Sequence, residues 1–302
     1  MDPGLRVEQV TPRKELDREI MELQSESVPA IQNASLEDNG TGGTRGAWTR
    51  NHLPIIVVSI GIAVVLIGGW QLSGRYLNPI TISTPGAILR SIPKTFLHGP
   101  YGSLASALGV TMIDFGLGFL GALVIGTSLG LAIGNSRVAR NILDPLVALG
   151  NSSPTIALLP LMIIWFGFGH SSRILFITVV SMWGMTINTA VGARKARERY
   201  EDLIPAFSVP QRMYLTSVVV PGSMPFIFAG IRVSLAHSLV ATIISGQEIG
   251  SSGIGGLAQL YGDQFKTNDL FGVIVVTTII ALVLYRVIEF LRNRVCNWVN
   301  YS

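Results

Sequence analysis

The residues that could carry chemistry in this sequence are ionisable side chains set within or beside long apolar runs. These residues are Asp114, Asp144, Arg232, His237, Glu248 and Glu289. A charge inside a lipid bilayer is costly, so such residues often serve the movement of ions or protons. All except Arg232 and His237 lie near the ends of apolar runs, where we expect them to snorkel to the lipid headgroups. The set therefore does not resemble a proton relay.

Enzymatic and metal chemistry find little support in the sequence. It contains neither the phosphate-binding motif G-x-x-x-x-G-K-[ST] nor the zinc motif H-E-x-x-H. Its four histidines are scattered, and its single cysteine, Cys296, excludes an internal disulfide. We therefore predict that the chain is not an enzyme, has no catalytic residue or metal site, and holds no cofactor of its own.

The composition predicts an all-α, polytopic membrane protein. Of the 302 residues, 49% are hydrophobic and only 13% are charged, which is too apolar for an ordinary soluble domain. A helix that spans a bilayer needs about 20 mostly apolar residues. Six runs of this kind predict six transmembrane helices, at residues 53–73, 104–134, 142–168, 173–193, 221–246 and 270–291.

The first 50 residues differ from the rest of the chain in polarity and charge. They are polar throughout, unlike a cleaved signal peptide, and we expect a flexible cytoplasmic extension at 1–50 and a membrane domain at 51–302. The extension has six basic and nine acidic side chains, net −3, which leaves 16 basic and nine acidic, net +7, for the membrane domain. No basic and aromatic patch accompanies that charge, so we expect no nucleic-acid partner.

The lysines and arginines near the ends of the runs predict the orientation in the membrane. With a cytoplasmic N-terminus, the inside collects eleven of them, namely Arg45, Arg50, Arg137, Arg140, Arg194, Lys195, Arg197, Arg199, Arg212, Arg292 and Arg294. The outside then has five, namely Arg75, Arg90, Lys94, Arg173 and Lys266. This excess favours a multi-pass protein with both termini in the cytoplasm.

A small residue recurs at every fourth position of the second run. The residues are Gly118, Ala122, Gly126, Gly130 and Gly134. They line one face of a helix and let another backbone approach closely, which most often means packing. A sharper alternative is a surface on which helices slide during a conformational cycle.

A polar segment, "RKARERYEDLIPAFSVPQRMYLTSVVVPGSMP", separates the fourth and fifth runs. We predict a short charged helix at 194–204, a break between Pro205 and Pro210, and a second helix at 211–219 before Pro221 opens the next span. A transporter without its own energy source needs a docking surface for a partner that supplies one. The alternative is an ordinary solvated loop, but the segment has more apolar surface than such a loop needs. The residues expected to couple to such a partner are Arg199, Tyr200, Glu201, Asp202, Leu203, Pro205, Phe207, Ser208, Pro210, Gln211, Arg212 and Tyr214.

The third and fifth runs are the best candidates for a pathway across the membrane. Pro154 and Pro160 should produce irregular helix, whose free carbonyls a membrane permits only beside protein or a water-filled cavity. The other expected lining groups are Trp165, Asn188, Arg232, Ser245, Gln247 and Glu248. Trp165 could equally belong to an interfacial aromatic belt. Arg232 and Glu248 could be structural or could meet an anionic substrate, and they are too far apart on one helix to pair with each other.

Several segments resemble the permease subunits of bacterial ABC importers of the nitrate, sulfonate and taurine type. They are "STPGAILRSI", "DPLVALGNSSPTIALLPLMIIWFGFG", "INTAVGARKA", "VVPGSMPFIFAGIRVSLAHS" and "GQEIGSSGIGGL". The resemblance implies a permease in the bacterial inner membrane with a cytoplasmic coupling helix between spans 4 and 5. It also implies two ATPase subunits that bind ATP and Mg, an external substrate-binding protein, and a second permease copy. We favour a homodimer over a heterodimer.

The coupling loop departs from the consensus of that family. Aligned on Pro221, the conserved glycine falls at Ser208, and Glu-Ala-Ala falls at Asp202, Leu203 and Ile204. Ser208 must therefore turn differently from glycine, and Pro210 is suited to begin the second helix. The resemblance suggests a small organic or inorganic anion as substrate. A standalone secondary transporter or channel is the alternative. Such a protein is expected to have inverted repeats or a buried ion relay, and we find neither in the sequence.

Overall fold

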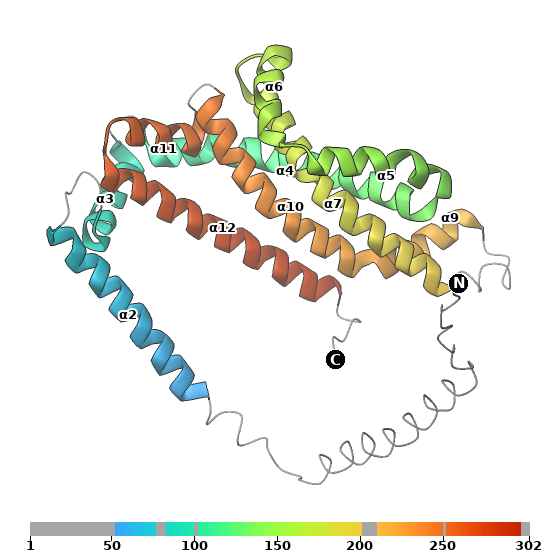
Figure 1. Ribbon diagram of the computed structural model, residues 1–302, viewed down its shortest axis with the longest axis horizontal. Coiled ribbons are helices and arrows are strands. Elements are labelled where there is room, and N and C mark those ends of the chain that lie inside the picture. The colour runs from blue at the N-terminus through green and yellow to red at the C-terminus, as the bar shows by residue number, and fades with distance from the viewer. Residues whose placement is uncertain (1–51, 77–82, 100–101, 201–209, 250–251, 297–302) are drawn as a thin grey trace, which may run out of the picture. The chain divides into compact units, whose positions relative to one another are not determined.

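The computed structural model describes residues 52–76, 83–99, 102–200, 210–249 and 252–296 (Figure 1). These residues form helices and connecting turns, with no β-strand among them. The chain divides into two compact units, 1–66 and 67–302, and the described part of the first unit belongs to a single helix. The predicted extension at 1–50 lies outside the described residues.

The helices follow one another with short connections. Their bounds are α2 His52–Tyr76, α3 Pro85–His98, α4 Leu104–Asn135, α5 Arg137–Ser152, a 3-10 turn Thr155–Leu158, α6 Leu159–Phe166, α7 His170–Tyr200, α9 Gln211–Tyr214, a π-helical turn Leu215–Val219, α10 Val220–Glu248, α11 Gly253–Asp263 and α12 Thr267–Val295. Side-chain caps define several starts: the Thr84, Ser103 and Ser136 hydroxyls accept from backbone N–H groups at the beginnings of α3, α4 and α5.

Four helices of the described chain are long and apolar enough to cross a membrane. They are α4, α7, α12 and the continuous helix Leu215–Glu248 that contains α10. The predicted all-α class is confirmed, and so are the helices expected at 104–134, 173–193, 221–246 and 270–291. Within α2, residues Val58–Leu72 form a shorter apolar stretch.

The third predicted span is not one helix, which corrects the expectation for 142–168. The helix α5 and the segment Thr155–Phe166 meet at a bend of 94°. Ser153 is extended because the residue before a proline avoids the α-helical region, and Pro154 cannot donate a backbone hydrogen bond. Pro160 then lies in the first turn of α6, where proline is tolerated. The two prolines therefore cause the irregular helix that the sequence predicts.

Helices α4 and α7 pack closely along the ridge of small residues. A Cβ atom on Gly118 would lie 2.7 Å from Ile177, and one on Gly130 would lie 2.5 Å from Thr189. Ala122, between them, is completely buried. The ridge therefore serves close packing, as the sequence predicts.

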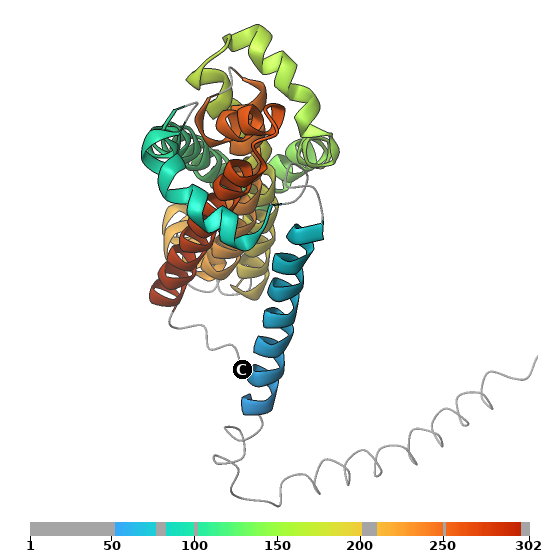
Figure 2. The same cartoon turned by 90° about the vertical axis from the view of Figure 1, so that its left-hand side faces the viewer.

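Helix α10 covers another face of α7, so that α4, α7 and α10 run side by side (Figures 1 and 2). The Ser234 hydroxyl of α10 donates to the Ser181 carbonyl oxygen of α7 at 2.6 Å, within the buried seam. Gly184 and Gly192 of α7 permit this approach, since a Cβ on either would lie within 2.7 Å of an α10 side chain. The three helices form the core of the second unit.

The helices α3 and α11 lie at the end of this core where α4 and α12 begin. Tyr261 of α11 is completely buried in a cluster with Leu104 and Val273. The Ser83 hydroxyl donates to the Asn268 side chain at 2.6 Å, and the Ile254 N–H donates to the Thr111 hydroxyl at 2.8 Å. These contacts close one end of the bundle and leave the opposite end to the charged segment.

Candidate functional site

The first half of the predicted coupling segment is the last part of α7 and not a separate short helix. Helix α7 continues without a break to Tyr200. Alanine, arginine, lysine and glutamate are good helix formers, and no proline interrupts them before Pro205. The prediction of a new helix beginning at 194 is therefore wrong. The residues Glu201, Asp202, Leu203, Pro205, Phe207 and Ser208 lie outside the described residues.

The second half is helical as predicted, but it runs directly into the next span. Pro210 precedes α9, in which Gln211 and Arg212 are the first residues. Residues 215–219 form a π-helical turn, with the Val220 N–H bonded to the Leu215 carbonyl. Pro221 has no N–H and its ring crowds the preceding turn, which gives a physical reason for the wider turn.

Two adjacent residues of α9 lie in opposite environments. Tyr214 is only 6% exposed and packs with Ala193 and Val219, while its hydroxyl donates to the Arg197 carbonyl oxygen at 3.4 Å. Met213 is 58% exposed. Tyr214 therefore anchors α9 to α7, and the exposed Met213 is available to a partner.

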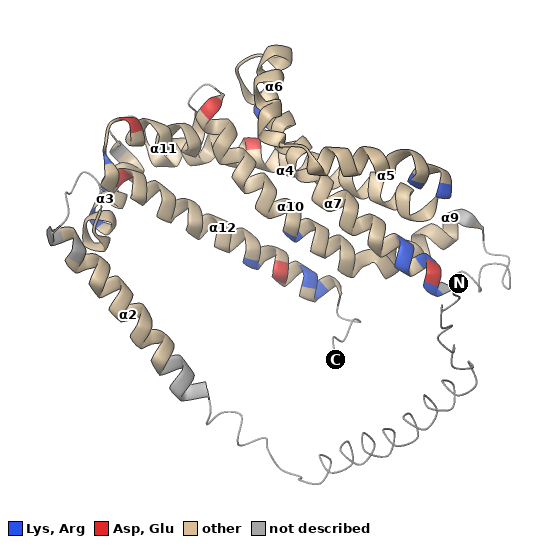
Figure 3. Cartoon of the chain, in the orientation of Figure 1, with Lys and Arg blue, Asp and Glu red and all other residues tan. Residues whose placement is uncertain are grey.

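Basic residues gather at the same end of the bundle, on α5 and at the end of α7 (Figure 3). Arg197 donates to the carbonyl oxygen of Asn135, the last residue of α4. Arg194 lies 3.7 Å from Asp144 of α5, and the Lys195 ammonium stands 5.2 Å from the ring centre of Phe226 on α10. Arg199, in the last turn of α7, is exposed. The end of α7 is thus joined to α4, α5 and α10.

The residues predicted for the pathway do not form one cluster. Pro154 and Pro160 are exposed at the bend, and Trp165 is 62% exposed with its ring edge-on to Phe166. Ser245 is buried and its hydroxyl donates to the Thr242 carbonyl of its own helix. Gln247 is half-buried, and Glu248 is exposed as the last residue of α10.

Asn188 and Arg232 lie deeper in the bundle. The Asn188 amide donates to the Gly184 carbonyl at 2.8 Å on the surface of α7. The Arg232 guanidinium lies 3.8 Å from Glu289 and 5.0 Å from the ring centre of Tyr285, both on α12. Its partner thus comes from another helix, as the spacing requires, and the charge is turned toward α12.

A buried ion pair between Asp114 and Arg173, with the exposed His170 beside it, joins α4 to the start of α7, and sequence reasoning missed it. The Asp114 carboxylate is 2% exposed and lies 2.5 Å from the His170 Nδ1 atom and 3.1 Å from the Arg173 Nε atom. The expectation that Asp114 snorkels to the headgroups is therefore wrong. The signal was present, because Asp114 stands four residues before Gly118 and so shares the face of the small-residue ridge.

A serine in α4 matches a hydrolase pattern by chance. Residues 126–130 read G-T-S-L-G. A nucleophile in such a motif stands at a sharp turn between a strand and a helix. Ser128 instead lies inside a continuous helix, where its hydroxyl donates to the Val124 carbonyl at 2.7 Å.

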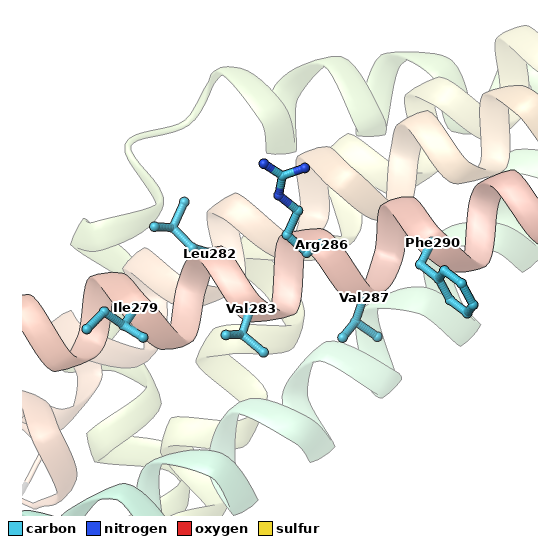
Figure 4. A pocket seen from close by; sticks show the side chains of 6 residues that line it. All are labelled: Ile279, Leu282, Val283, Arg286, Val287 and Phe290. Carbon is cyan, nitrogen blue, oxygen red and sulfur yellow. The ribbon is translucent and has the colours of Figure 1, made fainter. Parts of the chain in front are cut away.

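The helix α12 presents a shallow apolar hollow on its surface (Figure 4). Its lining residues are Ile279, Leu282, Val283, Arg286, Val287 and Phe290. Apart from Arg286, the lining offers only hydrocarbon, and α12 is the least buried of the four long helices. This surface is suited to lipid and not to a polar solute.

The chain is similar in sequence to known proteins. Residues 122–299 match the family described as "Binding-protein-dependent transport system inner membrane component". The chain is 27% identical to the taurine transport system permease protein TauC of Escherichia coli (strain K12), over 80% of this chain and 90% of that protein. It is 26% identical to the nitrate import permease protein NrtB of Synechocystis sp., over 85% of this chain and 97% of that protein. A putative aliphatic sulfonates transport permease protein, SsuC of Bacillus subtilis, is 25% identical over 89% of this chain and 94% of that protein.

Among solved structures, an ABC transporter chain shares the fold over part of this chain. A chain of the MetNI methionine ABC transporter, in an inward-facing conformation, aligns with a TM-score of 0.51 and 18% identity. The alignment covers 64% of this chain and 94% of that chain. The matched family region includes α7, α10, α12 and the whole coupling segment. The chain therefore belongs to the family of binding-protein-dependent transport system inner membrane components, the permease subunits of ABC importers.

Proposed function

We propose that this permease moves a small anion into the cell, using ATP hydrolysed by two separate ATPase subunits. The three relatives described above are named for taurine, nitrate and aliphatic sulfonates. Each of these solutes carries an oxyanion group. ATP and Mg belong to the ATPase subunits in this proposal, and an external binding protein delivers the solute.

The proposed topology has six membrane passages with both termini in the cytoplasm. Helix α2 provides the first passage, the bent pair of α5 and α6 provides the third, and the four long helices provide the others. The support for the orientation is the excess of arginine and lysine at the ends of the helices on one side. The basic residues at the end of α7 lie on that side. The proposed location is the bacterial inner membrane.

The proposed point of ATPase coupling is the segment from Arg199 to Tyr214. The single observation that carries this assignment is that the segment leads into two helices, α7 and Leu215–Glu248, that are long and apolar enough to cross a membrane. A rigid helix passes a displacement along its length, so a movement of the segment tilts both helices. The anchor at Tyr214 and the bond from Arg197 to α4 make the same displacement reach α4.

The proposed pathway lies between two copies of the permease. The support is the exposed bend at Pro154, because irregular backbone at membrane depth needs protein or water beside it. We favour two copies of this chain, since most oligomers have twofold symmetry. Contact with the solute along this pathway should be weak, with selectivity residing mainly in the external binding protein.

Uptake in cells tests the proposed function. A strain that lacks this chain should lose uptake of taurine, nitrate or an alkanesulfonate, and a plasmid copy should restore it. Met213→Glu should fail to restore uptake while the protein still reaches the membrane, whereas the matched variant Met213→Leu should restore it. Unchanged uptake of all three solutes in the deletion strain would overturn the anion assignment.

A further inference from the structure

Two polar side chains lie near the middle of the core helices on a surface that the chain leaves open. His237 lies 17 residues from the start of α10 and 11 from its end, about 25 Å and about 16 Å along the helix. It is exposed, and Asn188 of α7 is half-buried. Both positions lie in the middle part of helices that are long and apolar enough to cross a membrane.

The neighbours of His237 and Asn188 on this surface are apolar. Val233 and Val240 of α10, and Ile187 and Val191 of α7, are each more than a third exposed. In contact with lipid, an imidazole and an amide among such residues would be costly. Residues of this type inside a membrane almost always face the protein interior or water.

Both side chains lie beside Gly184 on the α7–α10 seam. The Asn188 amide donates to the Gly184 carbonyl, and the His237 Nδ1 atom lies 3.6 Å from the position that a Gly184 Cβ would occupy. A side chain at 184 would also meet Val233 at 2.7 Å. We call Gly184, Asn188 and His237 the seam notch.

The hydrogen-bonding capacity of the seam notch is not used up within the described residues. There, the His237 ring makes no hydrogen bond or ion pair, in contrast to Arg232, which is held by Glu289 and Tyr285 on α12. The Asn188 amide nitrogen has a second hydrogen besides the one given to Gly184. The notch therefore offers N–H donors to an acceptor that comes from outside the chain.

We propose that the seam notch lines a water-filled part of the translocation pathway, where it donates hydrogen bonds to the oxyanion of the passing solute. This assignment deepens the proposed function and depends on it for the identity of the solute. An imidazole and an amide offer single hydrogen bonds and not the bidentate clamp of an arginine, so they hold an oxyanion without trapping it, as conduction requires. The apolar hollow of α12 lacks these properties, and its Leu282 provides a matched surface that faces lipid (Figure 4).

Cysteine accessibility tests the proposal without knowledge of the solute. The chain has one cysteine, so Cys296→Ser gives a background free of thiols. Into it we would introduce His237→Cys, Asn188→Cys and, as control, Leu282→Cys. Native membranes that contain the full chain and its partners would be treated with an anionic and a cationic methanethiosulfonate of similar size. The reactions would be run without nucleotide and with ATP plus vanadate.

The anionic reagent should modify cysteine at 237 and at 188 at least tenfold faster than at 282 in one of the two nucleotide states. With each rate divided by that of the same reagent with a free thiol in solution, it should also react faster there than the cationic reagent, because each variant keeps the other donor. Equal, slow reaction at all three positions in both states would overturn the proposal, because it would identify a dry interface. Faster reaction of the cationic reagent on this normalised scale would overturn the preference for anions. If one variant fails to fold, the other carries the test.

These outcomes are separate from those of the uptake experiment. Labelling reports on water and charge at the seam notch, whichever solute the importer carries. A labelled notch in a strain with unchanged uptake would reject the proposed anion substrates and keep the water-filled notch. An unlabelled notch together with lost uptake would reject the water-filled notch and keep the proposed anion substrates.

Discussion

Asp114 of α4 and Arg173 of α7 form an ion pair at 3.1 Å in which both side chains are at least 95% buried. The pair stands at the same end of the bundle as the turn that precedes α7, where Gly167 and Gly169 adopt positive φ angles. It fixes the start of α7 against α4 just after the bent segment. A helix held in this way can rotate with its neighbour as a single body.

Removal of one partner of this pair should destabilise the protein strongly. For Asp114→Leu we expect a loss of about 3–5 kcal/mol, because an unpaired buried arginine remains. The double variant Asp114→Leu with Arg173→Leu should recover most of that loss. Thermal unfolding of the detergent-purified protein, followed by size-exclusion chromatography, measures both. Similar loss in the single and double variants would show that the charge pairing is not responsible.

On α4, a glycine that packs against α7 should not tolerate a larger side chain, whereas a glycine on another face of the helix should. Gly130→Ala places a Cβ 2.5 Å from Thr189 and 2.7 Å from the Thr186 carbonyl oxygen. We expect a cost of about 1–3 kcal/mol from this overpacking. Gly109→Ala on the same helix meets nothing within 4 Å and should be neutral or slightly stabilising. The same unfolding assay compares them, and equal midpoints for the two variants would contradict the packing.

Charge at two adjacent positions of α9 should have different consequences. Tyr214→Asp buries a charge beside Ala193 and Val219 and should lower the amount of folded protein in the membrane. Met213→Glu, on the exposed side, should leave folding intact and reduce co-purification of the ATPase subunits. Fluorescence-detected chromatography reports folding, and protein gels of the purified complex report the ATPase. If the Met213→Glu protein co-purifies with the full amount of ATPase subunits, Met213 does not belong to the interface.

The thiol of Cys296, beyond the end of α12, should react slowly. Burial raises the pKa of this thiol, and the positive charge of Arg292 offsets only part of that effect. Because the thiolate is the reactive form, alkylation by iodoacetamide at pH 8 should be slower in native membranes than after denaturation. The contribution of this thiol to the free energy of unfolding should fall as the pH rises from the ordinary pKa of the thiol to its raised pKa. Equal alkylation rates would contradict the burial.

The sequence predicts the long helices well because their apolar runs alone satisfy the length that a membrane demands. It also predicts the break at Pro154 and the packing role of the ridge, since proline geometry and glycine size act locally. The extent of α7 was misjudged because a change from apolar to charged residues marks the edge of the membrane and not the end of a helix. Asp114 was misjudged for a related reason: its neighbours His170 and Arg173 are more than fifty residues away in the chain, and only tertiary packing brings them to it.

Transport by the purified complex tests the central claim most directly. Proteoliposomes would contain this chain with its co-purified ATPase, with the binding protein and radiolabelled taurine on one side and ATP with Mg on the other. The account predicts accumulation that requires both ATP and the binding protein and that is lost with Met213→Glu but not with Met213→Leu; the same measurement is repeated with nitrate and an alkanesulfonate. Accumulation of any solute without ATP, driven by an ion gradient and abolished by an uncoupler, would contradict it.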